Sequence, residues 1–199
     1  LDRLLDLSPP GLDELVSLTR VTELLEETPG ATLVIDTAPT GHLLRLLALP
    51  EVLDGWLKAI FAVLLKNRQL VRLPRLTDRL IVLSKRLKLL RAMLVDPLRT
   101  TLYAVAIPTW LAFEETRDLL AACQGLGITV ARVLVNQLTA VRGSACPLCT
   151  ALAARESVVL SALTVAAAAI PVTAIALQTP PIGLVAIAEL GRRLYTQDD

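Results

Sequence analysis

The run Ala31-Thr-Leu-Val-Ile-Asp36-Thr-Ala-Pro-Thr-Gly-His42 decides how the rest of the chain is interpreted. Residues 32–35 are apolar or β-branched and lead directly into a carboxylate, the pattern of a strand buried on both faces of a parallel sheet. Asp36 is therefore expected at the carboxyl end of a strand, where open α/β sheets bind ligands. Pro39 and Gly41 end the strand, so we predict a loop over 37–42 and a helix after it.

Two interpretations of Asp36 follow from its position. In the simpler one, its carboxylate caps the next helix or turns the chain. In the other, it takes part in catalysis, because a carboxylate at a strand end followed by a loop is how P-loop NTPases hold Mg²⁺ and the attacking water.

The longer string favours the second interpretation. Residues 36–42, followed by Leu44-Arg45-Leu46-Leu47, resemble the switch II signature of the ArsA-type ATPases, the arsenite-pump ATPases and their relatives that deliver tail-anchored membrane proteins. The family commonly has Thr after the His, where this chain has Leu43. The resemblance implies that Asp36 is catalytic. The switch II residues that it implies are Thr37, Ala38, Pro39, Thr40, Gly41 and His42.

Composition limits the classes of protein that the chain can represent. Its 199 residues suffice for one sizeable domain, and a net charge of +1 gives no indication of nucleic-acid binding. Hydrophobic residues make up 54% and mean hydropathy is +0.60, which suits buried strands and helices. The apolar part 158–177 could span a bilayer, but Pro171 interrupts it and no aromatic belt flanks it, so we predict no transmembrane helix. We expect a cytoplasmic protein, since no signal peptide is visible and the three cysteines suit a reducing compartment.

Strand and helix patterns alternate along most of the chain. This order predicts an α/β fold with a parallel, P-loop NTPase-like sheet flanked by helices and joined by right-handed crossovers. The core is expected in 1–50 and 100–199, with a helical insertion subdomain at 51–99. Further strands are predicted at 100–107, 128–135 and 170–177, and helices at 12–27, 110–124, from the cysteine pair to about 163, and 182–195.

Polar residues follow these strands at the expected ligand edge. Thr109 follows one strand and Asn136 the next, so both are expected beside Asp36. Taken alone, Asn136 fits a turn residue better. Within the resemblance, it stands where the family has an Asn that hydrogen-bonds adenine, and an amide suits that role because it donates and accepts at once. Thr109 stands beside Pro108 where members often place an acidic residue, and 179–183 lack the usual acid and arginine.

The insertion 51–99 has two open interpretations. It holds eleven Lys and Arg against four Asp and Glu, and its leucines recur at helical spacing. The simpler interpretation is a helical hairpin with a solvated basic face. The other is an apolar groove for a client helix, as the targeting branch of the family carries there.

Cys146 and Cys149 form a single C-x-x-C pair. Structural zinc needs four ligands, so our first interpretation is a homodimer in which each chain supplies two thiolates. The resemblance to the ArsA-type family implies the same arrangement. A thioredoxin-like redox pair and two unligated thiols are the alternatives. Cys123 is expected in the core.

We therefore expect an ArsA-type ATPase that uses ATP and Mg²⁺ to drive anion transport or the targeting of tail-anchored proteins. Its partners are expected to be a second copy of the chain and a client helix or a membrane transporter subunit. The sequence contains no G-x-x-x-x-G-K-S/T string. We accordingly expect the first strand and phosphate loop of the fold to be missing and this chain to be inactive alone. The alternative is a non-catalytic, zinc-bridged dimeric binding module that offers an apolar helical surface.

Overall fold

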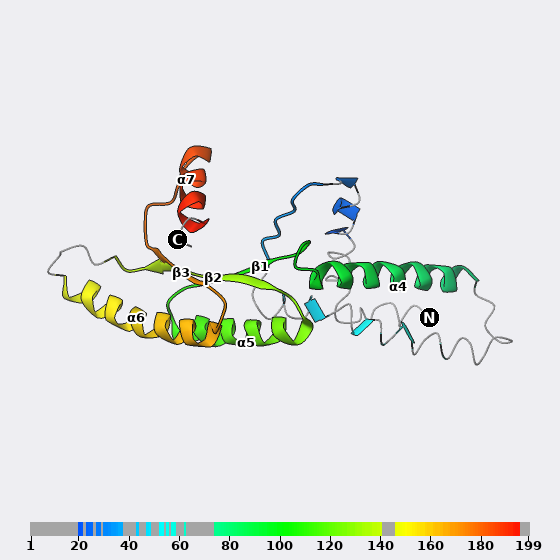
Figure 1. Ribbon diagram of the computed structural model, residues 1–199, viewed down its shortest axis with the longest axis horizontal. Coiled ribbons are helices and arrows are strands. Elements are labelled where there is room, and N and C mark those ends of the chain that lie inside the picture. The colour runs from blue at the N-terminus through cyan, green and yellow to red at the C-terminus, as the bar shows by residue number, and fades with distance from the viewer. Residues whose placement is uncertain are drawn as a thin grey trace, which may run out of the picture. The chain divides into compact units, whose positions relative to one another are not determined.

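The structure is a computed structural model, and it describes two continuous stretches, 74–140 and 146–195. Before these it describes residues 20, 21, 23–25, 27, 28, 30–37, 43, 47, 48, 52, 53, 55, 57, 58 and 62. The chain forms two compact units, Leu1–Thr100 and Thr101–Asp199 (Figure 1). The predicted helical subdomain at 51–99 stays a prediction.

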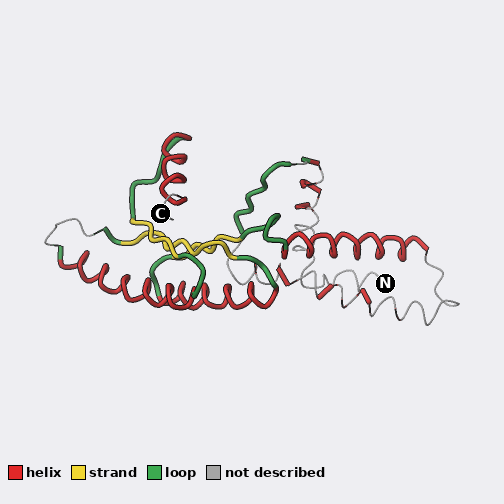
Figure 2. Tube along the Cα trace, in the orientation of Figure 1, coloured by secondary structure: helices red, strands yellow, loops and turns green. Residues whose placement is uncertain are grey.

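The second unit is built on a parallel three-stranded sheet, drawn in yellow in Figure 2. Its strands are β1 (Leu102–Ala106), β2 (Val130–Leu138) and β3 (Val172–Ala176), in the order β1-β2-β3. The expected α/β fold is confirmed, and so are these three strands. The end of β2 differs from the prediction, because this strand continues past Val135 to Leu138.

The described residues of this unit form the helices α5 (Trp110–Leu126), α6 (Pro147–Ala167) and α7 (Leu184–Tyr195). Helices α5 and α6 contact each other and cover one face of the sheet (Figure 1). The alternation of a strand explains the core, since Ala104 and Ala106 of β1 are buried while Tyr103 and Val105 are exposed. Where the structure describes this unit, its other buried apolar residues are Leu119, Cys123, Ile128, Val133, Val135, Val159, Leu163 and Ala167.

The first unit contains the helix α4 (Pro74–Val95). Leu87 and Leu90 of α4 are buried, as are Leu43, Leu47 and Leu57, so part of the predicted leucine seam packs in a core.

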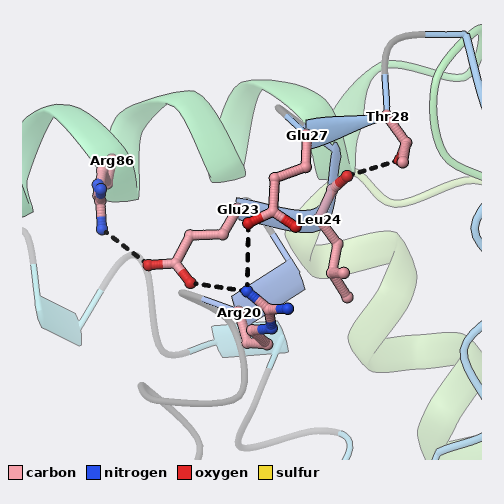
Figure 3. Close-up of polar contacts among 6 residues, drawn as sticks. All are labelled: Arg20, Glu23, Leu24, Glu27, Thr28 and Arg86. Carbon is pink, nitrogen blue, oxygen red and sulfur yellow. Dashed lines mark hydrogen bonds and ion pairs between the residues drawn. The ribbon is translucent and has the colours of Figure 1, made fainter.

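A small group of ion pairs links α4 to the helical residues between 20 and 27 (Figure 3). An Arg86 guanidinium nitrogen lies 3.6 Å from Glu23, and Arg20 lies 3.3 Å from Glu23 and 3.5 Å from Glu27. Since these side chains are largely exposed, each pair contributes at most about 1 kcal/mol to stability.

The strand predicted at 32–35 is wrong for this structure. Residues 31–37 have no regular secondary structure, and Leu33, Val34 and Ile35 are exposed, Val34 by 87%. An apolar run predicts burial, but a strand also needs a neighbour to accept and donate its backbone hydrogen bonds. No described strand pairs with residues 31–37, so this run is not part of the described sheet.

Among the described residues, α6 is the one helix with the length and composition to cross a membrane. It carries Arg155 and Glu156 near its middle and contacts α5, β2 and β3. Core helices of other folds pass the same test, so α6 does not mark a membrane protein.

Candidate functional site

Thr109 and Asn136 lie at the same edge of the sheet, at the carboxyl ends of neighbouring strands. The register pairs Ala106 of β1 with Val135 of β2, so Asn136 is level with Ile107, two residues before Thr109. Because both strands are parallel, the structure brings these two predicted residues together at the edge where α/β folds bind ligands.

Asn136 belongs to a bulge in β2. Between Val135 and Leu138 this strand advances three residues while its neighbour β3 advances two, from Ala174 to Ala176. The extra residue leaves Asn136 and Gln137 outside the ladder, and Gln137 has a left-handed backbone with φ 65°. The Asn136 side-chain oxygen Oδ1 accepts a hydrogen bond from the Gln137 backbone N–H at 2.9 Å. The bulge therefore sets Asn136 and Gln137 apart from the regular pairing of β2 with β3.

Two sets of hydrogen bonds hold the chain directly after the bulge. Leu177 donates its backbone N–H to the Leu138 carbonyl at 2.7 Å. Thr139 donates twice to the Glu156 carboxylate of α6, from its backbone N–H at 2.6 Å and from its hydroxyl at 2.9 Å. Glu156 is only 6% exposed.

Sequence analysis missed Glu156 and Thr139, although one signal was present. Glu156 continues the buried stripe of α6 formed by Val159, Leu163 and Ala167. An acid at helical spacing within such a stripe indicates a buried carboxylate with hydrogen-bond partners.

Thr109 is the N-cap of α5. Its backbone is extended, with φ −124° and ψ 153°, and its hydroxyl oxygen accepts a hydrogen bond from the Ala112 backbone N–H at 3.2 Å. The following Trp110 ring meets Phe113 edge-on at 5.5 Å, with the Arg117 guanidinium 6.0 Å from the Phe113 ring. The accepting oxygen of Thr109 is thus used by the helix, while its O–H proton is available to donate.

Asp36 and Thr37 lie in the exposed segment 31–37 of the first unit, which has no regular secondary structure. The other predicted switch II residues, Ala38, Pro39, Thr40, Gly41 and His42, lie outside the described residues. The structure therefore brings Thr109 and Asn136 together, and the catalytic assignment of Asp36 stays a prediction.

The two cysteines of the C-x-x-C pair lie at the start of α6. Cys146 is the N-cap, Pro147 occupies the first turn, and the Cys149 backbone N–H donates to the Cys146 sulfur at 3.3 Å. The hydrogen bond from the Cys149 thiol, with backbone N–H groups of the first turn, lowers the pKa of Cys146. The same thiol–thiol hydrogen bond raises the pKa of Cys149, and burial raises the pKa of Cys123. Cys146 is therefore the thiol that ionises first.

The pair fits half of a zinc site. Two thiols three residues apart at a helix start can ligate one ion together, but structural zinc takes four ligands. Within the described stretches, no three His, Cys, Asp or Glu side chains converge on a possible metal position. Further ligands would have to come from outside these stretches, and a second copy of the chain is one source.

Comparison with known proteins identifies the family. Residues 4–196 match the family of anion-transporting ATPases of the ArsA type. Over 168 residues the chain is 35% identical to the protein named ATPase GET3B of Arabidopsis thaliana, which covers 75% of this chain and 40% of that protein. Similarity extends to ATPase ARSA1 of Chlamydomonas reinhardtii, at 33% identity over 69% of this chain and 20% of that protein. It also extends to ATPase GET3C of Arabidopsis thaliana, at 30% identity over 75% of this chain and 42% of that protein.

The chain thus spans less than half the length of these relatives. The family match covers nearly all of its residues, and the described residues form the α/β fold expected of such a protein. The chain belongs to the ArsA family of anion-transporting ATPases.

Proposed function

We propose that this chain forms the adenine-binding part of an ATPase that hydrolyses ATP to drive the transport of an anion or the delivery of a membrane-protein client. The observation that supports this most directly is the bulge in β2, which sets the Asn136 amide at the carboxyl edge of the sheet next to the cap of α5. Bulges of this kind are frequent beside active sites because they redirect a side chain.

The proposed contacts follow from the donors and acceptors at this edge. The Asn136 Oδ1 oxygen has a second lone pair beyond the Gln137 hydrogen bond, and it accepts from the adenine amino group. The Asn136 Nδ2 group donates to a ring nitrogen, a pairing that guanine cannot satisfy. Thr109 donates its hydroxyl proton to the same ligand.

In this proposal Asp36 supplies the catalytic carboxylate, and residues 37–42 form the switch II loop that responds to the nucleotide. Bound Mg²⁺ would supply charge neutralisation for the phosphates and a site for the attacking water. The role of Asp36 is to orient that water through its carboxylate.

The client of the proposed ATPase is an apolar helix such as that of a tail-anchored membrane protein, with a transporter subunit as the other possible partner. Ile81, Val82 and Leu89 of α4 are exposed and lie among basic residues, which suits the binding of such a helix. The proposed location is the cytoplasm, where a client helix leaving synthesis is accessible.

Nucleotide titration tests this function. We expect ATP to shift the Gln137 backbone amide signal of the ¹⁵N-labelled chain more strongly than GTP, and Asn136→Ala to remove the preference. We also expect no phosphate release by this 199-residue chain, which has no G-x-x-x-x-G-K-S/T string. Equal responses to both nucleotides contradict the adenine contact, and turnover that is lost in Asp36→Ala contradicts the expected inactivity.

A second candidate function is favoured by the thiol pair. In it, Cys146 and Cys149 of two chains hold one Zn²⁺ in a homodimer that offers an apolar surface without catalysis. Elemental analysis combined with light scattering should give one zinc per two chains, and Cys149→Ser should abolish both the metal and the dimer. Cys123→Ala is the control, since Cys123 is buried in the core. A dimer that persists without metal refutes the zinc bridge.

A further inference from the structure

We infer that Glu156 is a positioning residue for base recognition: its buried carboxylate on α6 holds the bulge that carries Asn136. This inference rests on the proposed adenine contact of Asn136 and deepens it. Its starting point is that the bulge is a strained element. Gln137 adopts a left-handed backbone that side chains rarely take, and the extra residue interrupts the ladder between β2 and β3.

A strained segment persists only when its flanks are fixed. Before the bulge, β2 is fixed by its parallel pairing with β1 and β3 up to Val135. After the bulge, the chain is fixed by the backbone hydrogen bond from Leu177 to Leu138 and by the two hydrogen bonds from Thr139 to Glu156. Glu156 is therefore the side-chain anchor of the far flank. It accepts both hydrogen bonds from Thr139, which lies three residues after Asn136 in the chain.

The chemistry of Glu156 indicates that it fixes the orientation of the backbone at Thr139. A carboxylate that is 6% exposed is unfavourable unless it receives hydrogen bonds. Glu156 receives both of those that Thr139 can donate, at 2.6 Å and 2.9 Å, each on a different oxygen. Charge-assisted hydrogen bonds of this length are strong and directional, so they fix the orientation of the backbone at Thr139 as well as its distance from α6.

Base selectivity depends on that orientation. An amide distinguishes adenine from guanine only if its donor and acceptor meet the base edge in the correct order and plane. If the far flank of the bulge is released, Asn136 and Gln137 can relax to an ordinary backbone, and the Asn136 amide then turns away from the base. Loss of Glu156 is thus expected to act on the choice of base more than on the attraction of the nucleotide phosphates.

The test compares the affinity for ATP with the affinity for GTP, measured by titrating each nucleotide into the ¹⁵N-labelled chain. We expect Asn136→Ala and Glu156→Ala each to lower the ATP-to-GTP preference by about fivefold to tenfold, the value of roughly one hydrogen bond. Glu156→Gln should restore most of the preference, because its amide oxygen still accepts the Thr139 backbone N–H. Glu189→Ala is the matched control, because it removes an acid whose partner is the exposed Arg192 at 2.8 Å on α7.

A purely structural role for Glu156 predicts a different result. In that case Glu156→Ala lowers the affinities for ATP and GTP by the same factor and leaves their ratio unchanged. If Asn136→Ala does change the ratio, this result for Glu156→Ala overturns the inference. If Asn136→Ala itself leaves the ratio unchanged, the adenine contact of the proposed function fails instead.

Two further measurements keep the test decisive if Glu156→Ala folds poorly. Thr139→Val removes only the hydroxyl hydrogen bond, and it should lower the ATP-to-GTP preference by about threefold. Amide hydrogen exchange at Thr139 should accelerate in Glu156→Ala and remain slow in Glu189→Ala. Slow exchange at Thr139 without the Glu156 carboxylate contradicts the anchoring step, whatever the nucleotide affinities are.

Discussion

The packing of α6 on the sheet can be tested with two identical substitutions on the same helix. Val159 is fully buried and Val165 is 81% exposed. Replacing either valine by alanine improves helix propensity by up to about 0.6 kcal/mol, because alanine loses no side-chain freedom in a helix. This term is shared, so the difference between the two variants isolates the packing of Val159.

The magnitude follows from the atoms that are removed. Val159→Ala deletes two buried methyl groups, worth about 1.6 kcal/mol in transfer free energy, and the remaining cavity adds to the cost. We expect Val159→Ala to be less stable than Val165→Ala by about 2 to 3 kcal/mol in the free energy of unfolding. For a unit of this size the difference corresponds to about 10 °C or more in Tm.

The assay is urea unfolding followed by Trp110 fluorescence in a Trp56→Phe background, so that the signal comes from the second unit alone. The midpoint should fall for Val159→Ala at an unchanged slope, which shows that stability rather than compactness has changed. Equal midpoints for the two variants would falsify the assignment of α6 as a helix packed on the sheet.

Three further predictions concern two helix ends and the cysteines. Thr109→Ala should destabilise the second unit by about 1 kcal/mol in urea unfolding because it removes the cap of α5, whereas Thr109→Ser should keep most of the stability because serine also caps helices. Ala168→Gly should stabilise the unit by about 1 kcal/mol, measured as a higher Tm, because φ at this position is 53°. Iodoacetamide should modify Cys146 before Cys149 and leave Cys123 unmodified in the folded chain, as mapped by mass spectrometry. Because the pKa of Cys146 is lowered, its modification should begin at a lower pH than that of an ordinary thiol, and equal rates for the pair contradict this order.

The regular part of the second unit could be predicted from sequence. Strands β1 and β3 and helices α5, α6 and α7 each have an apolar period that repeats over several residues, and their ends are marked by residues such as Pro108 and Gly127. The parallel order of the strands then places Thr109 and Asn136 at one edge without further information.

The bulge could not be predicted, because it is a difference between two strands. The local sequence of β2 does not indicate that β3 advances one residue less between Val135 and Leu138, and Asn136 alone suits an ordinary turn. Glu156 escaped notice for a related reason. Its role depends on Thr139, seventeen residues earlier in the chain. The strand predicted at 32–35 failed differently, since hydrophobic pattern predicts burial but does not supply a pairing partner.

The exposed run Leu33, Val34 and Ile35 also bears on the behaviour of the chain at high concentration. Short apolar segments that are exposed can associate with identical segments from other molecules, and such stacking begins aggregates. The charge of Asp36 opposes this process, since stacking in register would bring one carboxylate directly above another. We therefore expect Asp36, the residue proposed to orient water in an ATPase, also to limit self-association of the segment beside it.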